Sequence, residues 1–187
     1  MACMLSFVAA SLAVLLMPGP TNTILAGSGG ATGFRRAAAL PVAEAVGYSI
    51  AVGAFLAASS FLSTVPFALP TLKAIAAVWL LITAYTLWRQ PVVPDLTERR
   101  GAFVRVLVTT LLNPKAMLVG TVLIPGMAGD RQGLAAAVFV GLSILAGIGW
   151  VALGSLLPKS VRRYSYKGAA LVVLGFSIAA AASAGQL

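Results

Sequence analysis

Two ionisable side chains stand inside long apolar segments of this sequence, where charged groups are rare. Lys115 follows Asn113-Pro114 near the middle of one such segment, and Glu44 is the single acid within any of them. A charge at the centre of a bilayer costs roughly 2.5–3.5 kcal/mol on insertion scales, so an intramembrane charge indicates a functional site. A carboxyl group in apolar surroundings favours its neutral, protonated form, which suits a proton carrier.

Each of these residues also has a purely structural interpretation. Glu44 sits about two turns into its apolar segment, so it can be an interfacial acid paired with Arg35 or Arg36. Lys115 can extend its stem toward the membrane surface, but both interfaces lie roughly 15 Å away, beyond its reach. We therefore expect Lys115 to face an aqueous or paired site. The expected depths of Glu44 and Lys115 differ by about 9 Å, which makes a direct pair between them strained.

Two proline motifs predict breaks in the helices that carry these groups. Pro18-Gly19-Pro20 lies in the middle of the first apolar segment, and Pro114 in the middle of the fourth. Proline lacks an amide N–H, so the carbonyls of Val14, Leu16 and Thr110 lose their helical partners. Broken backbone within a bilayer is tolerated only against protein or a water-filled cavity. We therefore expect the first and fourth helices to break and the breaks to line a shared hollow.

The composition indicates the class of protein. The chain has 187 residues, of which 60% are hydrophobic and 9% charged, whereas soluble domains carry about 25% charged residues. Apolar segments of about 20 residues, long enough to cross a bilayer, recur along nearly the whole chain. We interpret residues 1–187 as one all-α integral membrane domain. The first segment has no positively charged stretch before it, so we expect a retained crossing rather than a signal peptide.

The rarity of reactive side chains disfavours an enzyme. The chain has one cysteine, Cys3, no histidine, and four acidic residues. One cysteine cannot form an internal disulfide or a dithiol relay, and no metal or catalytic site based on histidine can be assembled. We therefore expect no enzymatic activity, no cofactor and no metal site.

The distribution of basic residues predicts the orientation. Six crossings are expected, at about 4–26, 38–62, 67–88, 103–126, 132–157 and 167–186. The first, third and fifth connections carry Arg35, Arg36, Arg89, Arg99, Arg100, Arg105, Lys159, Arg162, Arg163 and Lys167, whereas the second and fourth carry Lys73 and Arg131. Basic loops stay in the cytoplasm, so both termini are expected on the opposite side. The net charge of +9 then reflects topology and contact with anionic lipids rather than binding of nucleic acid.

A weak internal repeat predicts two related halves. At an offset of 96 residues the matched positions are Leu15 to Pro18 with Leu111 to Pro114, Gly33 with Gly129, Arg35 with Arg131, and Gly53 with Gly149. Halves of about 1–93 and 94–187 hold three crossings each and therefore enter the membrane in opposite directions. Inverted repeats of this kind are typical of secondary transporters.

A stripe of small residues in the second apolar segment favours close helix packing. Ala43, Gly47 and Ala51 recur at intervals of four residues, so they lie on one helix face and let another helix approach closely. That neighbour is either a helix of the same chain or a helix of a second copy. The stripe therefore leaves both internal packing and a homo-oligomer open.

Taken together, these motifs resemble the LysE/RhtB family of bacterial inner-membrane amino-acid exporters. The resemblance covers the whole chain and rests on Pro18-Gly19-Pro20 with Asn22, Gly33-Phe34-Arg35-Arg36-Ala37, Leu72-Lys73, Trp79-Leu80-Leu81, Tyr85, Trp88-Arg89, and Leu111-Leu112-Asn113-Pro114-Lys115-Ala116 followed by Pro125. Two positions depart from the family pattern. Thr21 intervenes before Asn22, and where members commonly carry a polar residue in the second crossing this chain has Tyr48, with the acid Glu44 one turn earlier.

The resemblance implies a secondary transporter that exports amino acids or related small zwitterionic metabolites from the cytoplasm. The expected substrate-binding residues are those of the two breaks, namely Pro18, Gly19, Pro20, Thr21, Asn22, Asn113, Pro114 and Lys115. Free amides near Thr21 and Asn22 stand at the positive end of a half-helix and suit a carboxylate. The freed carbonyls suit an ammonium or a coupling cation. Glu44 is the expected proton carrier for exchange with protons, and the two halves are expected to rock about the centre.

Three other functions stay open from the residues alone. The same breaks can line a passive pore or small channel for solutes. A membrane-embedded enzyme or redox protein is disfavoured by the missing histidine and the lone cysteine. A structural subunit without transport activity leaves Lys115 and Glu44 in the membrane without a purpose.

Overall fold

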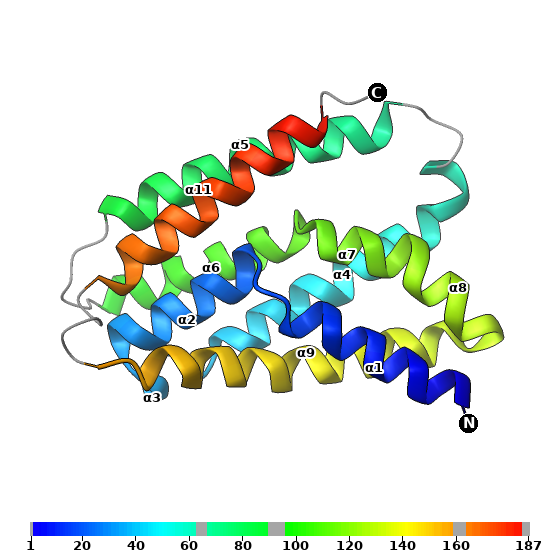
Figure 1. Cartoon of the computed structure of the whole chain (residues 1–187), viewed down its shortest axis with the longest axis horizontal. Helices are drawn as coiled ribbons and strands as arrows, with labels where there is room; N and C mark the ends of the chain where they lie inside the picture. Colours follow the sequence, from blue (N-terminus) through cyan, green and yellow to red (C-terminus); the bar gives the residue numbers. More distant parts are fainter. Residues whose placement is uncertain (1, 63–66, 90–95, 159–163, 185–187) are drawn as a thin grey trace.

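The chain folds into helices that lie roughly along one long axis, as the computed structural model in Figure 1 shows. The structure describes residues 2–62, 67–89, 96–158 and 164–184, and no strand occurs in these ranges. The elements are α1 (Ala2–Leu16), α2 (Pro20–Thr32), α3 (Phe34–Ala37), α4 (Leu40–Leu62), α5 (Ala68–Arg89), α6 (Leu96–Leu111), α7 (Pro114–Leu118), the π-helical segment η1 (Val119–Leu123), α8 (Ile124–Ala128), the 3-10 turn η2 (Gly129–Arg131), α9 (Gln132–Ser155) and α11 (Ser165–Ala184). The all-helical class predicted from the sequence is confirmed.

Several helical stretches are long and apolar enough to cross a membrane. They are Phe34–Ala58, Pro70–Arg89 and the 55-residue stretch Gly101–Ser155, and the bent pair Met4–Leu16 with Pro20–Thr32 makes a fourth if it counts as one crossing. One crossing needs about 20 residues, so the third stretch is longer than a single crossing. Figure 1 shows the chain reversing between α8 and α9 within it. The apolar part of α11, Tyr166–Ala182, is shorter, and the six crossings expected from the sequence stay a prediction.

Large apolar side chains cover much of the outer surface. Leu5, Ile50, Leu81, Leu145 and Ile178 are each at least half exposed, and they come from five different helices. Soluble monomers rarely expose contiguous apolar surface on this scale. Together with the long apolar helices, this surface indicates a membrane-embedded protein.

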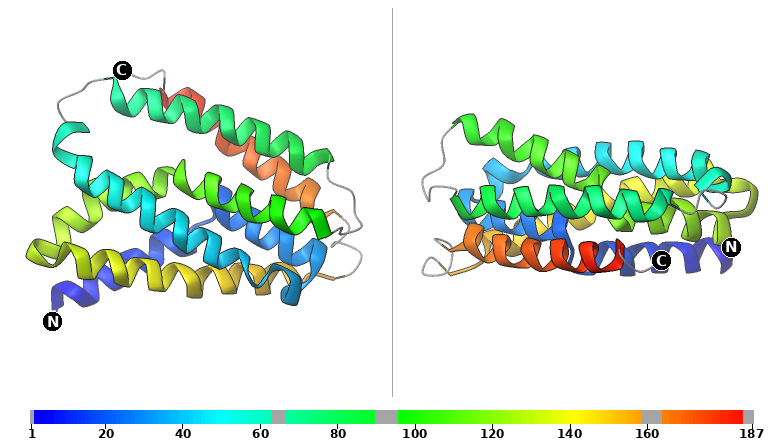
Figure 2. Two further views of the ribbon diagram at one scale, coloured as in Figure 1. Left: turned by 180° about the vertical axis from the view of Figure 1, so that it is seen from behind. Right: turned by 90° about the horizontal axis from the view of Figure 1, so that it is seen from above.

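Helix pairing runs across the two sequence halves. α5 packs along α11, α2 along α9, and α4 against α6, α7 and α9, and Figure 2 shows α5 and α11 side by side from two further directions. Ser177 of α11 donates to the Ala77 carbonyl of α5 at 2.8 Å. The rings of Tyr48 and Phe139 join α4 to α9 with their centroids 5.1 Å apart. Within the described residues, neither half therefore forms a packed body of its own.

The helix bounds repeat along the chain with the offset seen in the sequence. Shifted by 96 residues, α1 falls on α6, α2 on α7 to α8, α4 on α9 and α5 on α11. In the described ranges two residues have a positive φ, Gly33 (83°) and Gly129 (52°). They also lie 96 residues apart, and they end α2 and α8. Figure 1 shows α1 and α6 running in opposite directions along the long axis.

Two expected connections are shorter in the structure than the sequence predicts. α2 continues to Thr32, so Gly29-Gly30 lies inside a helix. α2 packs closely on α9 at this point, because a Cβ on Gly29 would clash with the Val151 backbone. α6 begins at Leu96, where Leu, Glu and Arg are good helix formers. The rest of the polar loop after Arg89, including the boundary between the halves near residues 93–94, lies outside the described residues.

Candidate functional site

The first break lies where the proline motif predicts it. α1 ends at Leu16 and α2 begins at Pro20, with a 59° bend between them. The side-chain amide of Asn22 donates two hydrogen bonds back across the break, to the carbonyls of Leu15 at 2.7 Å and Met17 at 2.9 Å. Asn22 is almost fully buried, so its carboxamide holds the two half-helices at their angle from within the bundle.

The second break is capped by the residue that precedes its proline. α6 ends at Leu111 and α7 begins at Pro114. The Asn113 side-chain oxygen accepts from the backbone amide of Lys115 at 3.0 Å, and its carbonyl accepts from Ala116 at 2.9 Å. Asparagine is a favoured N-cap and proline a favoured first helical residue. Asn113-Pro114 therefore ends one half-helix and starts the next.

The two breaks meet, as the sequence analysis expects. Asn113 donates from its side-chain nitrogen to the Thr21 hydroxyl at 2.9 Å, and the Thr110 hydroxyl lies 3.4 Å from the same oxygen. The Lys115 ammonium donates to the Met17 carbonyl. The half-buried Lys115 side chain also crosses Gly19, where a Cβ would stand 2.9 Å from its Cε. The cation of one half is thus bonded to the broken backbone of the other.

The carbonyls at the breaks only partly match the expectation. The carbonyls of Val14 and Leu16 have no helical partners, because Pro18 and Pro20 lack an N–H. Neither carbonyl accepts another bond within the described residues. The prediction for Thr110 is wrong, because its carbonyl accepts the Asn113 amide at 3.1 Å in a tighter 3-10-like turn. Among the described residues, the last turn of α6 instead leaves the carbonyls of Thr109 and Leu111 without their helical partners, because the Asn113 amide turns to Thr110 and the Lys115 amide to the Asn113 side chain.

Glu44 occupies a buried site beside the junction rather than the membrane interface. Its side chain is 1% exposed, and its Oε2 has no hydrogen-bond partner in the described part of the chain. Gly147 of α9 provides the space, because a Cβ there would stand 2.6 Å from Oε2. Arg35 and Arg36 are exposed, and among the described residues neither is paired with Glu44. The interfacial interpretation of this acid is therefore not supported.

Glu44 has two ionisable neighbours, Lys115 and Tyr48. The carboxyl of Glu44 and the ammonium of Lys115 interact electrostatically but form no direct ion pair, in line with their different expected depths. Tyr48, one turn further along α4, is fully buried, and its hydroxyl has no hydrogen-bond partner within the described ranges. The site thus combines a cation bonded to main chain with a separate buried acid.

Some contacts at the junction have no clear signal in the sequence. The Trp150 indole donates toward the Leu15 carbonyl at 3.5 Å. From the sequence, a tryptophan in an apolar segment indicates only that its N–H needs an acceptor, not which one. Gly147 is one of many glycines in apolar helices, and only the fold brings it to Glu44. The hydroxyl of Thr110 is a polar group near a proline, and only the fold brings it to the Thr21 hydroxyl.

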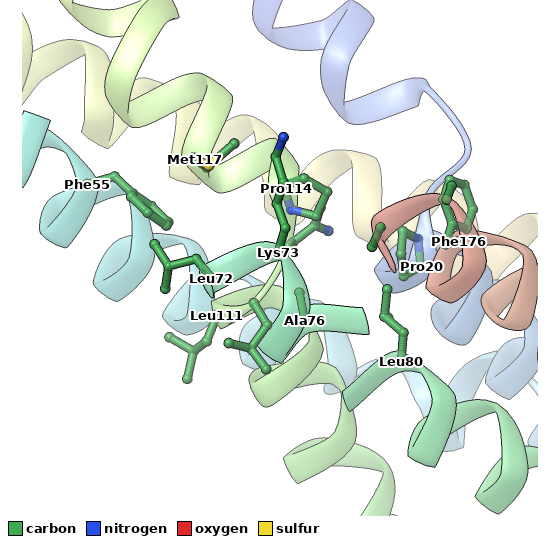
Figure 3. A pocket seen from close by; sticks show the side chains of 14 residues that line it. Pro20, Phe55, Leu72, Lys73, Ala76, Leu80, Leu111, Pro114, Met117 and Phe176 are labelled. Atoms are coloured by element: carbon green, nitrogen blue, oxygen red, sulfur yellow. The ribbon is translucent and has the colours of Figure 1, made fainter. Parts of the chain in front are cut away.

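A cleft of about 210 Å3 opens beside the junction, between the α5–α11 pair and the helices that carry the breaks. Pro20, Asn113 and Pro114 form its end at the junction. Figure 3 shows Leu72, Ala76, Leu80 and other apolar side chains around the remaining space, with Lys73 among them.

The chemistry available at the junction is binding and proton transfer. It offers an ammonium, a carboxyl group, hydroxyls and unpaired carbonyls.

No protein-family model, no curated protein and no solved structure matches the chain.

Proposed function

We propose that the protein is a secondary transporter that exports amino acids or related small zwitterionic metabolites from the cytoplasm in exchange for protons. The observation that carries this proposal is the meeting of two broken helices within an apolar bundle, with Lys115 bonded to the Met17 carbonyl between them. Unwound backbone at membrane depth is a recurring way in which transporters bind substrates. The resemblance of the motifs to the LysE/RhtB exporters points to the same class of substrate.

The proposed topology has six crossings, arranged as two inverted halves of three helices in a bacterial inner membrane. The 96-residue offset shared by helix bounds and by Gly33 and Gly129 supports related halves. The opposite directions of α1 and α6 in Figure 1 support their inversion. The positive-inside distribution of Lys and Arg then puts both termini outside the cytoplasm.

In the proposed binding mode, the substrate carboxylate replaces the Met17 carbonyl as the partner of Lys115. The amides of Thr21 and Asn22, in the first turn of α2, add the positive end of that half-helix. The substrate ammonium is accepted by carbonyls that the breaks leave unpaired, among them that of Leu111. These groups come from both halves, so substrate joins the two breaks.

Glu44 is the proposed proton carrier. A carboxylate without a hydrogen-bond partner, buried against Gly147, favours taking up a proton. The Glu44 carboxyl group can hold a proton when it is neutral or attract a cationic group when it is ionised. Because these two states exclude each other, proton entry is coupled to substrate exit. Its electrostatic interaction with Lys115 links the two events.

The packing favours a particular moving part. α4 packs against α6 and α7, while α1 and α2 pack against α9, so the rocking of one complete half would break these contacts. α5 and α11 pack chiefly on each other, with α11 also against α2, and the Trp79 indole donates a hydrogen bond to the Thr109 hydroxyl that joins α5 to α6. We propose that this helix pair moves against the remaining bundle and opens the junction alternately to each side.

Counterflow in proteoliposomes tests the function. Vesicles loaded with unlabelled amino acid should take up labelled amino acid faster than empty vesicles, and this uptake should saturate. Lys115→Ala and Pro18→Leu should abolish counterflow while leaving membrane insertion intact. Arg131→Ala, which removes an exposed cation in η2, is the control and should behave as wild type. Normal transport by both junction variants refutes the assignment, and a passive pore gives uptake without counterflow.

A further inference from the structure

The cleft beside the junction has almost entirely apolar walls. Phe55, Leu72, Ala76, Leu80, Met117 and Phe176 contribute carbon surface from α4, α5, α7 and α11. The polar side chains of the lining are Asn113, at the junction, and Lys73. None of the described lining residues is an acid.

We propose that this cleft holds the side chain of the substrate, and that the substrate is an amino acid with an uncharged apolar side chain of leucine, methionine or phenylalanine size. The inference rests on the proposed export function and names the substrate class for the same site. The carboxylate and ammonium of the substrate lie at the break junction, and the side chain projects between α5, α7 and α11.

The mainly apolar lining disfavours charged substrate side chains. A lysine or arginine side chain in the cleft would be surrounded by carbon and would find no acid among the described lining residues. Glu44, the buried acid on α4, is turned toward Gly147 of α9 and does not line the cleft. An acidic side chain leaves water for carbon surface, which is costly for a charged group.

The size of the cleft supports a large side chain. A volume of about 210 Å3 is far more than a single water molecule needs. Each methylene buried in such a space strengthens binding about fourfold. Leucine is therefore expected to bind roughly 50-fold more tightly than alanine.

The polar end of the cleft fits the rest of an amino acid. Leu111 and Leu112 line the cleft, and their carbonyls lack helical partners. The Lys115 amide donates to the Asn113 side chain and the Ala116 amide to the Asn113 carbonyl. Carbonyls without helical partners on residues that line the cleft can accept from an ammonium whose attached side chain lies in the cleft.

The test is competition in counterflow of labelled leucine, with leucine, methionine, phenylalanine, alanine, lysine and glutamate as competitors. Ala76→Phe fills the cleft and should lower the preference for leucine over alanine at least 10-fold. Leu72→Ala enlarges the cleft and should raise the preference for phenylalanine over leucine. Val78→Phe adds the same ring to the exposed face of α5 and should leave both preferences unchanged.

Each result separates this inference from the proposed function. In one outcome, leucine shows saturable counterflow that lysine or glutamate inhibits more strongly than methionine does. In that case the protein is an exporter and the proposed substrate class is wrong. If both cleft variants keep the wild-type preferences, the cleft is filled by lipid acyl chains, and the inference fails while export stands. If no amino acid gives counterflow, the proposed function fails and this inference fails with it.

Discussion

The side chain of Lys115 lies across the bare backbone of Gly19, with 2.9 Å between its Cε and the position of a Cβ on that glycine. The two residues are 96 residues apart, which is the offset at which the helix bounds recur. Gly19, in the first break, therefore leaves the space that the side chain of Lys115, in the second break, fills. Gly19 has an extended backbone with φ of −161°, which any residue adopts, so the close approach is the reason for glycine here.

Gly19→Ala should impair transport more than stability. The added methyl group displaces the end of a flexible side chain, so we expect a loss of stability of about 1 kcal/mol or less. It also moves the ammonium of Lys115 away from the Met17 carbonyl, and we expect counterflow to fall at least 10-fold. Gly53→Ala, where a Cβ meets nothing within 4 Å, should transport normally. Equal activity of the two variants contradicts a functional contact between Lys115 and Gly19.

Asn22→Ala should destabilise the first break. The change removes both side-chain hydrogen bonds across the bend and leaves the buried Leu15 carbonyl with only the long contact to Trp150. A buried polar group without a partner costs about 1–3 kcal/mol, so the purified protein should melt at a lower temperature. Gln132→Ala at the start of α9 is the control amide variant. A melting temperature that matches the control shows that Asn22 does not hold the bend.

Thr21 and Asn113 should be energetically coupled, because their hydrogen bond joins the breaks of the two halves. Asn113 also caps α7, so Asn113→Ala alone removes more than this contact. A double-mutant cycle with Thr21→Val isolates the pair, and we expect a coupling of about 0.5–1.5 kcal/mol in thermal or denaturant unfolding. Thr21→Ser keeps the hydroxyl and should retain most of the coupling. Additive effects of the two substitutions mean that the breaks are not joined here.

The breaks were predictable because proline acts on its own helix. Pro20 and Pro114 each start a half-helix in the structure, as their missing amides require. The charge of Lys115 likewise predicted a polar partner, and the Met17 carbonyl of the first break supplies one. Both inferences use local chemistry and the properties of a bilayer, without knowledge of how the helices pack.

Features that depend on tertiary packing were beyond the sequence. The crossing limits predicted from the sequence, 4–26 and 38–62, leave Gly29 in a connection, because nothing in the sequence says that α9 lies against it. The Thr110 carbonyl was expected to be free, but the turn before Pro114 tightens and satisfies it. The pairing of α5 with α11 across the halves, and with it the cleft, follows from three-dimensional contacts.

The contact between α2 and α9 should tolerate no side chain at its two glycines. A Cβ on Gly29 would clash with the Val151 carbonyl, and one on Gly154 would clash with that of Ala26. Both neighbours are backbone, so no rotamer change relieves the clash. We expect Gly29→Ala and Gly154→Ala to lose at least about 3 kcal/mol of stability and to give little folded protein. Gly141→Ala on α9, with nothing within 4 Å, should be recovered in normal yield, and equal yields of all three rule out the close packing.

Glu44→Gln should uncouple transport from the proton gradient. Glutamine keeps the size and the neutral polarity of a protonated glutamate, so the space beside Gly147 stays filled, but it cannot gain or lose a proton. Wild-type export should accelerate when the solution on the non-cytoplasmic side of the membrane is made acidic relative to the cytoplasmic side. The variant should lose that acceleration and keep counterflow, which needs no net proton movement. Asp130→Asn neutralises an exposed acid in η2 and should respond to the gradient as wild type does. A Glu44→Gln variant that still responds to the gradient shows that another group carries the proton.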